Sequence, residues 1–406
     1  MKSSPQLERY SNFVDRALID EIYSLASPLA GIHVAHLNTT PKGGGVAEIL
    51  EPLVSIMQEL GIKHTWKVVQ LTDSSKKFMF RLWDLLQGDS GLLPSEEQDI
   101  HTEELSRSLE SLGEIPTDVY IVHDFQLAPL AKISHFIRPA IWFCHIDTAN
   151  PNPESEMYLK QFLDAYDLCA FNTPYSILKW LPQEDVRVIN LGIDPFKSKN
   201  ILLPKSEGID LLTRCGVDIT RPLITQVSRF DKWKNPWQAI DAYRLVKQEI
   251  PSVQLALVGA IESLEDIRAA KILADVRNYA EGDPDIYLLH DANLIGEKEV
   301  NAFQSYSNVI FQRSSREGFG LTVTEAMWKK QPVVGTSATG LRHQITHGRN
   351  GYTVDETEKC AECTLKLIQN SDLLRELGEQ AHIHVRNNSL VPVMIRDFLE
   401  AISKVV

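Results

Sequence analysis

Long hydrophobic runs are absent from this chain. None of its apolar stretches approaches the roughly 18 residues that a membrane-spanning helix needs, which excludes a transmembrane protein. The N-terminal residues are polar and carry neither the apolar core nor the small-residue cleavage site of a secretory signal. We therefore expect a cytoplasmic protein.

Cysteine is also scarce. The chain has 5 cysteines in 406 residues, an odd and thinly spread set that does not suit a disulfide framework, so we expect reduced thiols. Cys360 and Cys363 form one C-x-x-C pair within a helical pattern. Because no second pair accompanies it, helix packing is a better interpretation than a metal site.

Positive charge is in deficit. Lys and Arg total 41 against 54 Asp and Glu, which gives a formal net charge of −13. Binding to nucleic acid or to an anionic membrane surface needs a positive field, so neither is an expected partner. Any phosphate that this protein binds must be held by a local basic site.

Strand-like apolar runs alternate with amphipathic helical runs, the pattern of parallel sheets covered by helices. The alternation breaks between residues 192 and 205, where Pro and Gly gather, and then restarts. This predicts an α/β protein of two Rossmann-like domains, residues 1–197 and 198–390, with the helical tail 391–406 packing back on the first. The expected strands are 32–37, 65–69, 119–122, 140–144, 168–172, 186–190, 223–228, 254–258, 286–289, 309–312 and 332–335.

The most informative segment follows the expected strand 309–312. Glu317 falls in a glycine-flanked turn at the end of that strand, where open α/β sheets bind ligands, and Glu325 lies on the helix that follows. Glycines there let the backbone approach a ligand closely, and a carboxylate acceptor suits the hydroxyls of a ribose. The alternative is an ordinary turn with one capping glutamate and one in a surface salt bridge. The expected binding residues are Gly318, Phe319, Gly320, Leu321, Thr322 and Glu325.

Two basic residues follow the first strand of the second half. Arg229 and Lys234 stand at the expected crevice edge of a strongly acidic protein, where they suit a leaving diphosphate. Negative charge grows on the leaving oxygen as the donor bond breaks, and positioned cations stabilise it. A solvated charge cluster is the alternative interpretation.

The first half offers two further segments. Gly43, Gly44 and Gly45 precede a helix and suit an anion or hydroxyl cradle, although their spacing matches neither the dinucleotide fingerprint nor the Walker loop. A flexible turn is the alternative. His145 and Asp147 follow the strand 140–144, where they would bind sugar hydroxyls or shape the reaction centre.

Together, segments 43–48, 144–147, 226–234 and 316–328 resemble retaining glycosyltransferase family 4, within it the branch of trehalose glycosyltransferring synthases and retaining trehalose phosphorylases. The resemblance covers about residues 30–350. It implies the GT-B architecture, with an interdomain cleft, the acceptor bound mainly by the first domain and the donor by the second. At Phe143, the resemblance implies an arginine.

The resemblance also implies roles: Arg229 and Lys234 on the diphosphate, Glu325 on the ribose, Glu317 on the transferred sugar and His145 near its C6 hydroxyl and anomeric carbon. The loop 43–45 would close over phosphates and acceptor. Retention would follow a same-face mechanism in which the leaving phosphate oxygen accepts the acceptor's proton. No cofactor is required, with Mg²⁺ at most stimulatory, and a homodimer is expected by analogy.

The leading hypothesis is transfer of glucose from ADP- or UDP-glucose to glucose, forming α,α-trehalose. Three alternatives stay open: a retaining phosphorylase that uses glucose 1-phosphate, a family 4 transferase with another donor or acceptor, and a non-catalytic binder of sugar nucleotides. The ribose ligand expected at Glu325 argues against the phosphorylase.

Overall fold

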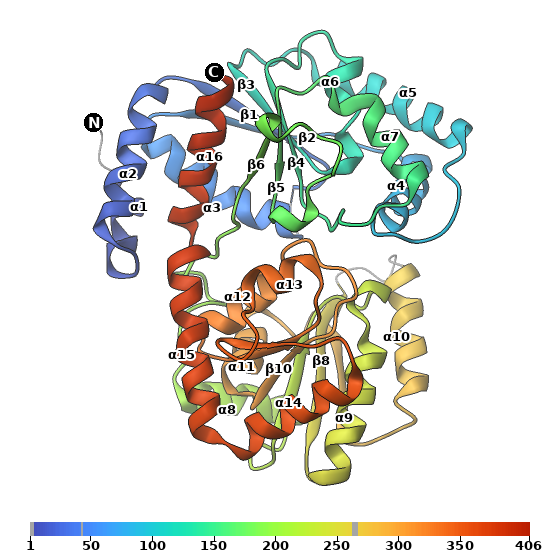
Figure 1. The fold of residues 1–406 in the computed structure, drawn as a ribbon, viewed down its shortest axis with the longest axis vertical. Coiled ribbons are helices and arrows are strands. Elements are labelled where there is room, and N and C mark those ends of the chain that lie inside the picture. Colours follow the sequence, from blue (N-terminus) through green and yellow to red (C-terminus); the bar gives the residue numbers. More distant parts are fainter. Residues whose placement is uncertain (1–3, 42–43, 262–266) are drawn as a thin grey trace. The chain divides into compact units, whose positions relative to one another are not determined.

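The computed structural model describes residues 4–41, 44–261 and 267–406 (Figure 1). The chain forms two compact units, one made of Met1–Gly192 with Ser389–Val406 and the other of Ile193–Asn388. The chain thus enters the second unit a few residues before the expected boundary at 197, and its last residues belong to the first unit. Gly43 lies outside the described residues.

The first unit is built on a six-stranded sheet in the order β2-β1-β3-β4-β5-β6, in which every neighbouring pair is parallel. β3, β4 and β5 are buried at every position, as expected for strands covered on both faces. The strands are β1 His33–Asn38, β2 Lys63–Val68, β3 Val119–His123, β4 Ala140–Cys144, β5 Leu168–Phe171 and β6 Val186–Val188. The α-helices are α1 Pro5–Glu8, α2 Arg16–Ala26, α3 Gly45–Glu59, α4 Asp73–Leu86, α5 Ser95–Leu112, α6 Leu130–Ile133, α7 Pro153–Leu163 and α16 Val391–Val405.

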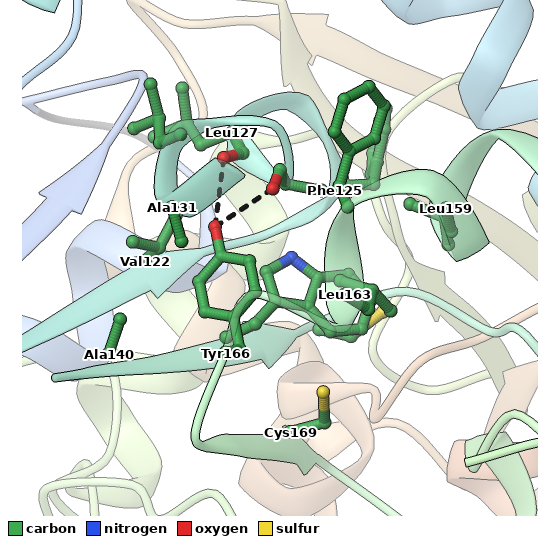
Figure 2. Close-up of a cluster of buried hydrophobic side chains, with 14 of the residues drawn as sticks. Val122, Phe125, Leu127, Ala131, Ala140, Leu159, Leu163, Tyr166 and Cys169 are labelled. Carbon is green, nitrogen blue, oxygen red and sulfur yellow. Dashed lines mark hydrogen bonds between the residues drawn. The ribbon is translucent and has the colours of Figure 1, made fainter. Parts of the chain in front are cut away.

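A hydrophobic core fills the space between this sheet and α4 to α7. Figure 2 shows a part of it, in which side chains from β3, β4 and β5 meet those of α7. Tyr166 brings a hydroxyl into this cluster and donates it to the carbonyls of Leu127, at 3.3 Å, and Ala128, at 3.0 Å. The polar atom is therefore satisfied, as buried polar atoms must be.

The helix α16 packs against α2 and α3 of the first unit. Asp397 on α16 accepts from both the backbone N–H and the side-chain amide of Asn190, each at 2.9 Å. Gly192 lies close against the backbone of Leu390, since a Cβ on Gly192 would come within 2.4 Å of its carbonyl carbon. The segment that follows β6 is thus joined to α16 and the residue before it by specific contacts.

The second unit repeats the architecture, with the order β12-β11-β10-β7-β8-β9 and all neighbouring pairs parallel. The strands are β7 Leu223–Val227, β8 Gln254–Ile261, β9 Ile286–Asp291, β10 Val309–Gln312, β11 Val333–Gly335 and β12 Gly351–Thr353. The α-helices are α8 Lys205–Arg214, α9 Pro236–Glu249, α10 Ile267–Tyr279, α11 Glu297–Tyr306, α12 Leu321–Trp328, α13 Thr339–Gln344, α14 Thr357–Gln369 and α15 Ser371–Asn388.

Both sheets confirm the predicted α/β class. Every expected strand has a counterpart within a few residues, and among the residues that the structure describes only β12 lacks an expected counterpart. In each sheet the parallel strands bring their carboxyl ends to one edge, so the segments that follow β4, β7 and β10 are where a ligand site is expected. Within the described residues, no helix is both long and apolar enough to cross a membrane.

Candidate active site

The turn after β7 is built by its own side chains. Asp231 caps a short 3-10 helix, η6 Lys232–Lys234, by accepting from the N–H of Trp233 at 2.8 Å. Asn235 then takes a left-handed conformation, with φ of 47°, before Pro236 starts α9. The side-chain amide of Gln226, in β7, donates to the carbonyl of Lys234 at 2.9 Å. This turn therefore fixes Lys234 beside the end of β7, while Arg229 lies exposed in the same segment.

Lys234 and Glu317 meet at the carboxyl edge of the second sheet. The Lys234 ammonium lies 2.6 Å from Oε2 of Glu317, and side-chain exposure is only 17% for the lysine and 9% for the glutamate. The same oxygen also accepts from Nε2 of Gln312 and from the hydroxyl of Ser314, each at 3.1 Å. Two predicted site residues from separate loops are thus brought together, with the carboxylate held by three donors.

The loop between Glu317 and α12 is held in place by contacts with residues of α13. Gly320 has φ of +90° and caps α12, a conformation that favours glycine. The carbonyl of Phe319 accepts from the side chain of Gln344 at 2.7 Å. Gly340 packs directly under Phe319, where a Cβ would come within 2.3 Å of the Phe319 carbonyl oxygen.

The remaining predicted loop residues line this turn. Gly318 and Phe319 are buried, whereas Gly320, Leu321 and Thr322 are half-buried. The first turn of α12 therefore offers the partly exposed positions of the loop.

Glu325 lies in α12 and is buried, with 1% of its surface exposed. One carboxylate oxygen is 2.6 Å from the ammonium of Lys199, and the other accepts from Nε2 of Gln304 at 3.0 Å. Oε1 of Gln304 in turn accepts from Lys329 at 2.8 Å, and burial lowers the pKa of Lys329 to about 8. The predicted ribose ligand is therefore part of a buried charged network that its sequence motif did not indicate.

In the first unit, His145 follows β4 and is half-buried. Its backbone N–H donates to Oδ1 of Asp124 at 3.3 Å, and its carbonyl accepts from Asn172 at 3.1 Å. The ring lies against Phe143, with centroids 4.1 Å apart. Burial lowers the pKa of His145 to about 3, so the imidazole is neutral at physiological pH.

Asp147 is buried two residues further on. Its Oδ1 accepts from the N–H of Ala149 at 3.0 Å, while Oδ2 meets no hydrogen-bond partner within residues 4–41, 44–261 and 267–406. A buried carboxylate oxygen of this kind is a natural acceptor for a hydroxyl.

The glycine loop is described only in part. Gly44 has φ of +82° and caps α3, which begins at Gly45, so these two glycines stand at a helix N-terminus as predicted. Gly43 is outside the described residues. Nothing within the described chain brings together three or more His, Cys, Asp or Glu side chains in a way that would hold a metal ion.

Sequence reasoning missed the residues that hold the predicted ones. Lys199 lies in the segment taken as a linker, and Gln304 lies in a helical pattern. Gln226 and Gln312 lie in expected strands, and Gln226 opens a segment of the family resemblance, but neither was given a role. Gln226 lies in β7 and Gln312 in β10, which are mostly apolar strands. A polar side chain in such a strand is the sequence signal that would have indicated these two residues.

Comparisons with known proteins identify the fold and the family. Residues 36–177 match the family model described as trehalose synthase, N-terminal domain, and residues 216–384 match the one described as glycosyl transferases group 1. Among solved structures, an α,α-trehalose 6-phosphate synthase from Burkholderia multivorans aligns with a TM-score of 0.72 at 17% identity, over 92% of this chain and 99% of that one. The fold is therefore that of a GT-B glycosyltransferase.

The sequence relatives are more specific. A trehalose synthase from Thermococcus litoralis is 37% identical over 98% of this chain and 97% of that protein, and one from Rubrobacter xylanophilus is 37% identical over 98% and 96%. A trehalose phosphorylase from Pleurotus sajor-caju is 23% identical over 94% of this chain and 59% of that protein. The chain belongs to the trehalose synthase family of group 1 glycosyl transferases. It is a hexosyltransferase, and the glycosyl transfer that it catalyses is related to trehalose.

Proposed function

We propose that this protein transfers glucose from a nucleoside-diphosphate glucose, ADP- or UDP-glucose, to free glucose, and forms α,α-trehalose with retention of configuration. The observation that carries the proposal is the Lys234 and Glu317 pair at the carboxyl edge of the second sheet. It sets a cation and a sugar-binding carboxylate side by side, as transfer from a sugar diphosphate requires.

In this proposal, Arg229 and Lys234 stabilise the negative charge that grows on the leaving diphosphate. Glu317 accepts hydroxyls of the transferred glucose, and Lys234 holds the Glu317 carboxylate in place. Glu325 takes the ribose hydroxyls, for which it must exchange or share its contacts with Lys199 and Gln304.

The first unit supplies the acceptor side. His145 contacts the transferred sugar near C6 and the anomeric carbon. Asp147 offers Oδ2 to a sugar hydroxyl, and the loop 43–45 covers the phosphates and the acceptor. The leaving phosphate oxygen accepts the acceptor's proton on the same face. No cofactor is required, Mg²⁺ is at most stimulatory, and we place the protein in the cytoplasm as a homodimer.

A retaining phosphorylase is the second candidate, favoured by the 23% identity to a trehalose phosphorylase over 94% of the chain. Glu325, which has no ribose to bind in a glucose 1-phosphate reaction, argues against it.

Product analysis tests the proposal. The purified protein is incubated with a panel of sugar nucleotides and with glucose 1-phosphate, each with and without free glucose. Trehalose together with a released nucleoside diphosphate supports the synthase and identifies the donor. Trehalose and phosphate from glucose 1-phosphate and free glucose, without any nucleotide, support the phosphorylase. Turnover only with another acceptor rejects trehalose as the product.

A further inference from the structure

Four histidines of the first unit form one hydrogen-bonded chain across the sheet. Nε2 of His145 lies 3.0 Å from Nδ1 of His123, and Nε2 of His123 lies 3.0 Å from Nδ1 of His36. Nε2 of His36 then lies 3.1 Å from Nδ1 of His64. The planes of successive rings differ by only 16 to 21°, and their centroids are 5.2 to 5.3 Å apart, as expected for rings that meet edge to edge through their nitrogens.

Strand register produces this chain. His64 in β2 pairs with Val34 in β1, and His36 lies two residues further along β1. His36 pairs with Ile121 in β3, and His123 lies two residues beyond it.

The same offset recurs at the next strand. His123 pairs with Phe143 in β4, and His145 again lies two residues beyond its partner. Because alternate residues share a face, an offset of two at each step keeps all four rings on one face of the sheet.

All four rings are neutral at physiological pH. Burial lowers the pKa of His64 to about 4 and of His145 to about 3, and it lowers the pKa values of His36 and His123 well below the ordinary range. Each neutral ring has one N–H and one bare nitrogen. Each of the three contacts then needs one donor and one acceptor, so the protons must all lie on the same side of their rings.

Only two arrangements satisfy all three contacts. In one, every ring is protonated on Nδ1, and His64 keeps a bare Nε2 at the far end. In the other, every ring is protonated on Nε2, and His64 carries an N–H there. The two arrangements give His145 opposite characters at Nδ1, a donor in the first and a bare acceptor in the second.

The far end selects between them. Nε2 of His64 is buried and meets no hydrogen-bond partner among the residues that the structure describes. A buried N–H without an acceptor is rarer in proteins than a buried acceptor without a donor. The arrangement that leaves Nε2 bare is therefore the more stable one.

We infer that His64, His36 and His123 are positioning residues that hold the proton of His145 on Nδ1, so that His145 presents a fixed N–H donor to the reacting sugar. The part of this inference that concerns the sugar rests on the proposed function; the part that concerns the proton does not. His145 alone contacts substrate, and the other three act through it.

Nitrogen NMR of protein labelled with ¹⁵N-histidine tests the tautomer directly, because protonated and bare ring nitrogens have well-separated shifts. The signals of these four rings are assigned among those of the 12 histidines by single substitutions. Protonation of His145 and of the other three rings on Nδ1 is expected in the wild-type protein. A proton on Nε2 of His145, or a mixture of both forms, would overturn the inference whether or not the protein has the proposed activity.

A matched pair of variants at His64 tests the coupling. In His64→Asp, a carboxylate that only accepts hydrogen bonds when it is ionised replaces Nδ1, so at a pH that ionises it the chain must reverse and His145 must move its proton to Nε2. In His64→Asn, the amide of the same size still donates to His36, so His145 keeps its proton on Nδ1. An unchanged tautomer of His145 in a folded His64→Asp protein refutes the coupling, and if that variant does not fold, the wild-type spectrum still decides.

Kinetics test the link to the reaction. In His64→Asp, kcat is expected to fall about tenfold with both KM values unchanged within about twofold, and His64→Asn is expected to stay near wild type. Reversal of the tautomer without loss of kcat would reject a role in the reaction. Absence of any turnover with sugar nucleotides in the wild-type protein would reject the proposed function and leave the tautomer result standing.

Discussion

The pair formed by Lys234 and Glu317 gives the sharpest test of the candidate site. Lys234→Met keeps most of the side-chain volume and removes the charge, which leaves the Glu317 carboxylate with Gln312 and Ser314 as donors. Breaking a buried ion pair by removing one partner costs about 3 kcal/mol at this degree of burial, because the remaining charge is left without compensation. Turnover should fall by roughly 10² through lost stabilisation of the leaving group.

A second substitution separates stability from catalysis. In Lys234→Met with Glu317→Gln, no charge remains to be compensated, so most of the lost stability should return, to within about 1 kcal/mol. Turnover should not return, because the cation is still missing.

Hydrogen exchange of peptides from β10 and α12 measures the local free energy of opening, and product formation measures kcat. Lys359→Met is the control for stability, since its pair with Glu362 is exposed on both sides and its loss should have no measurable effect. Equal destabilisation of the single and the double variant would refute the ion-pair argument. A kcat within threefold of wild type in Lys234→Met would remove Lys234 from the site.

Glu325→Gln should raise the Kd of the sugar nucleotide about tenfold in calorimetry, because an amide is a poorer acceptor for ribose hydroxyls, and unchanged affinity would contradict that role. Gly340→Ala should lower stability by about 2 kcal/mol and reduce turnover, because the added Cβ would displace Phe319. Gly296→Ala is the control, since its Cβ would first meet the flexible end of the Glu299 side chain at 3.2 Å. Thermal melts and activity assays should show neither effect in the control. Burial raises the pKa of Asp124 from 3.8 to about 6. This carboxyl group therefore favours the folded state below about pH 4 and loses that contribution as the pH rises to 6. In thermal melts, the stability of Asp124→Asn relative to wild type should therefore be higher at pH 7 than at pH 4. Cys215 is half-buried whereas Cys144, Cys169, Cys360 and Cys363 are buried, so a thiol reagent should modify Cys215 first in the native protein, and faster labelling of a buried thiol would contradict the fold.

The fold was predictable because hydrophobic alternation is a local property. Strands such as β3 and β4 are short apolar runs between helical patterns, and their burial on both faces follows from the parallel sheet. β12, whose residues are Gly351–Thr353, contains no run of apolar side chains that would have indicated a strand. The places of the candidate site residues in the fold were predictable for the same reason, since these side chains follow β4, β7 and β10.

The partners of those side chains were not predictable. Lys199 reaches Glu325 from a segment with no periodic pattern, and only the three-dimensional structure brings them within 2.6 Å. The histidine chain depends on register: a slip of one residue between β1 and β3 would turn His36 and His123 to opposite faces. Sequence patterns specify faces within a strand, but register between strands is decided by packing.

Under the proposed function, the two carboxylates of the candidate site bear on how an acidic protein would hold a diphosphate. Lys234 and Lys199 are each paired with a glutamate at 2.6 Å, so their positions are fixed by the fold and they need no reorganisation when charge develops. The pairing also weakens the attraction between each lysine and a phosphate in the ground state, because Glu317 and Glu325 already neutralise the lysine charges. When hydroxyls of a glucose donate to Glu317 and hydroxyls of a ribose donate to Glu325, each carboxylate interacts less strongly with its lysine. Each lysine can then interact more strongly with phosphate. If the proposed roles are right, sugar and phosphate binding are thus coupled through the ion pairs, and the whole donor should be held more tightly than the sum of its parts.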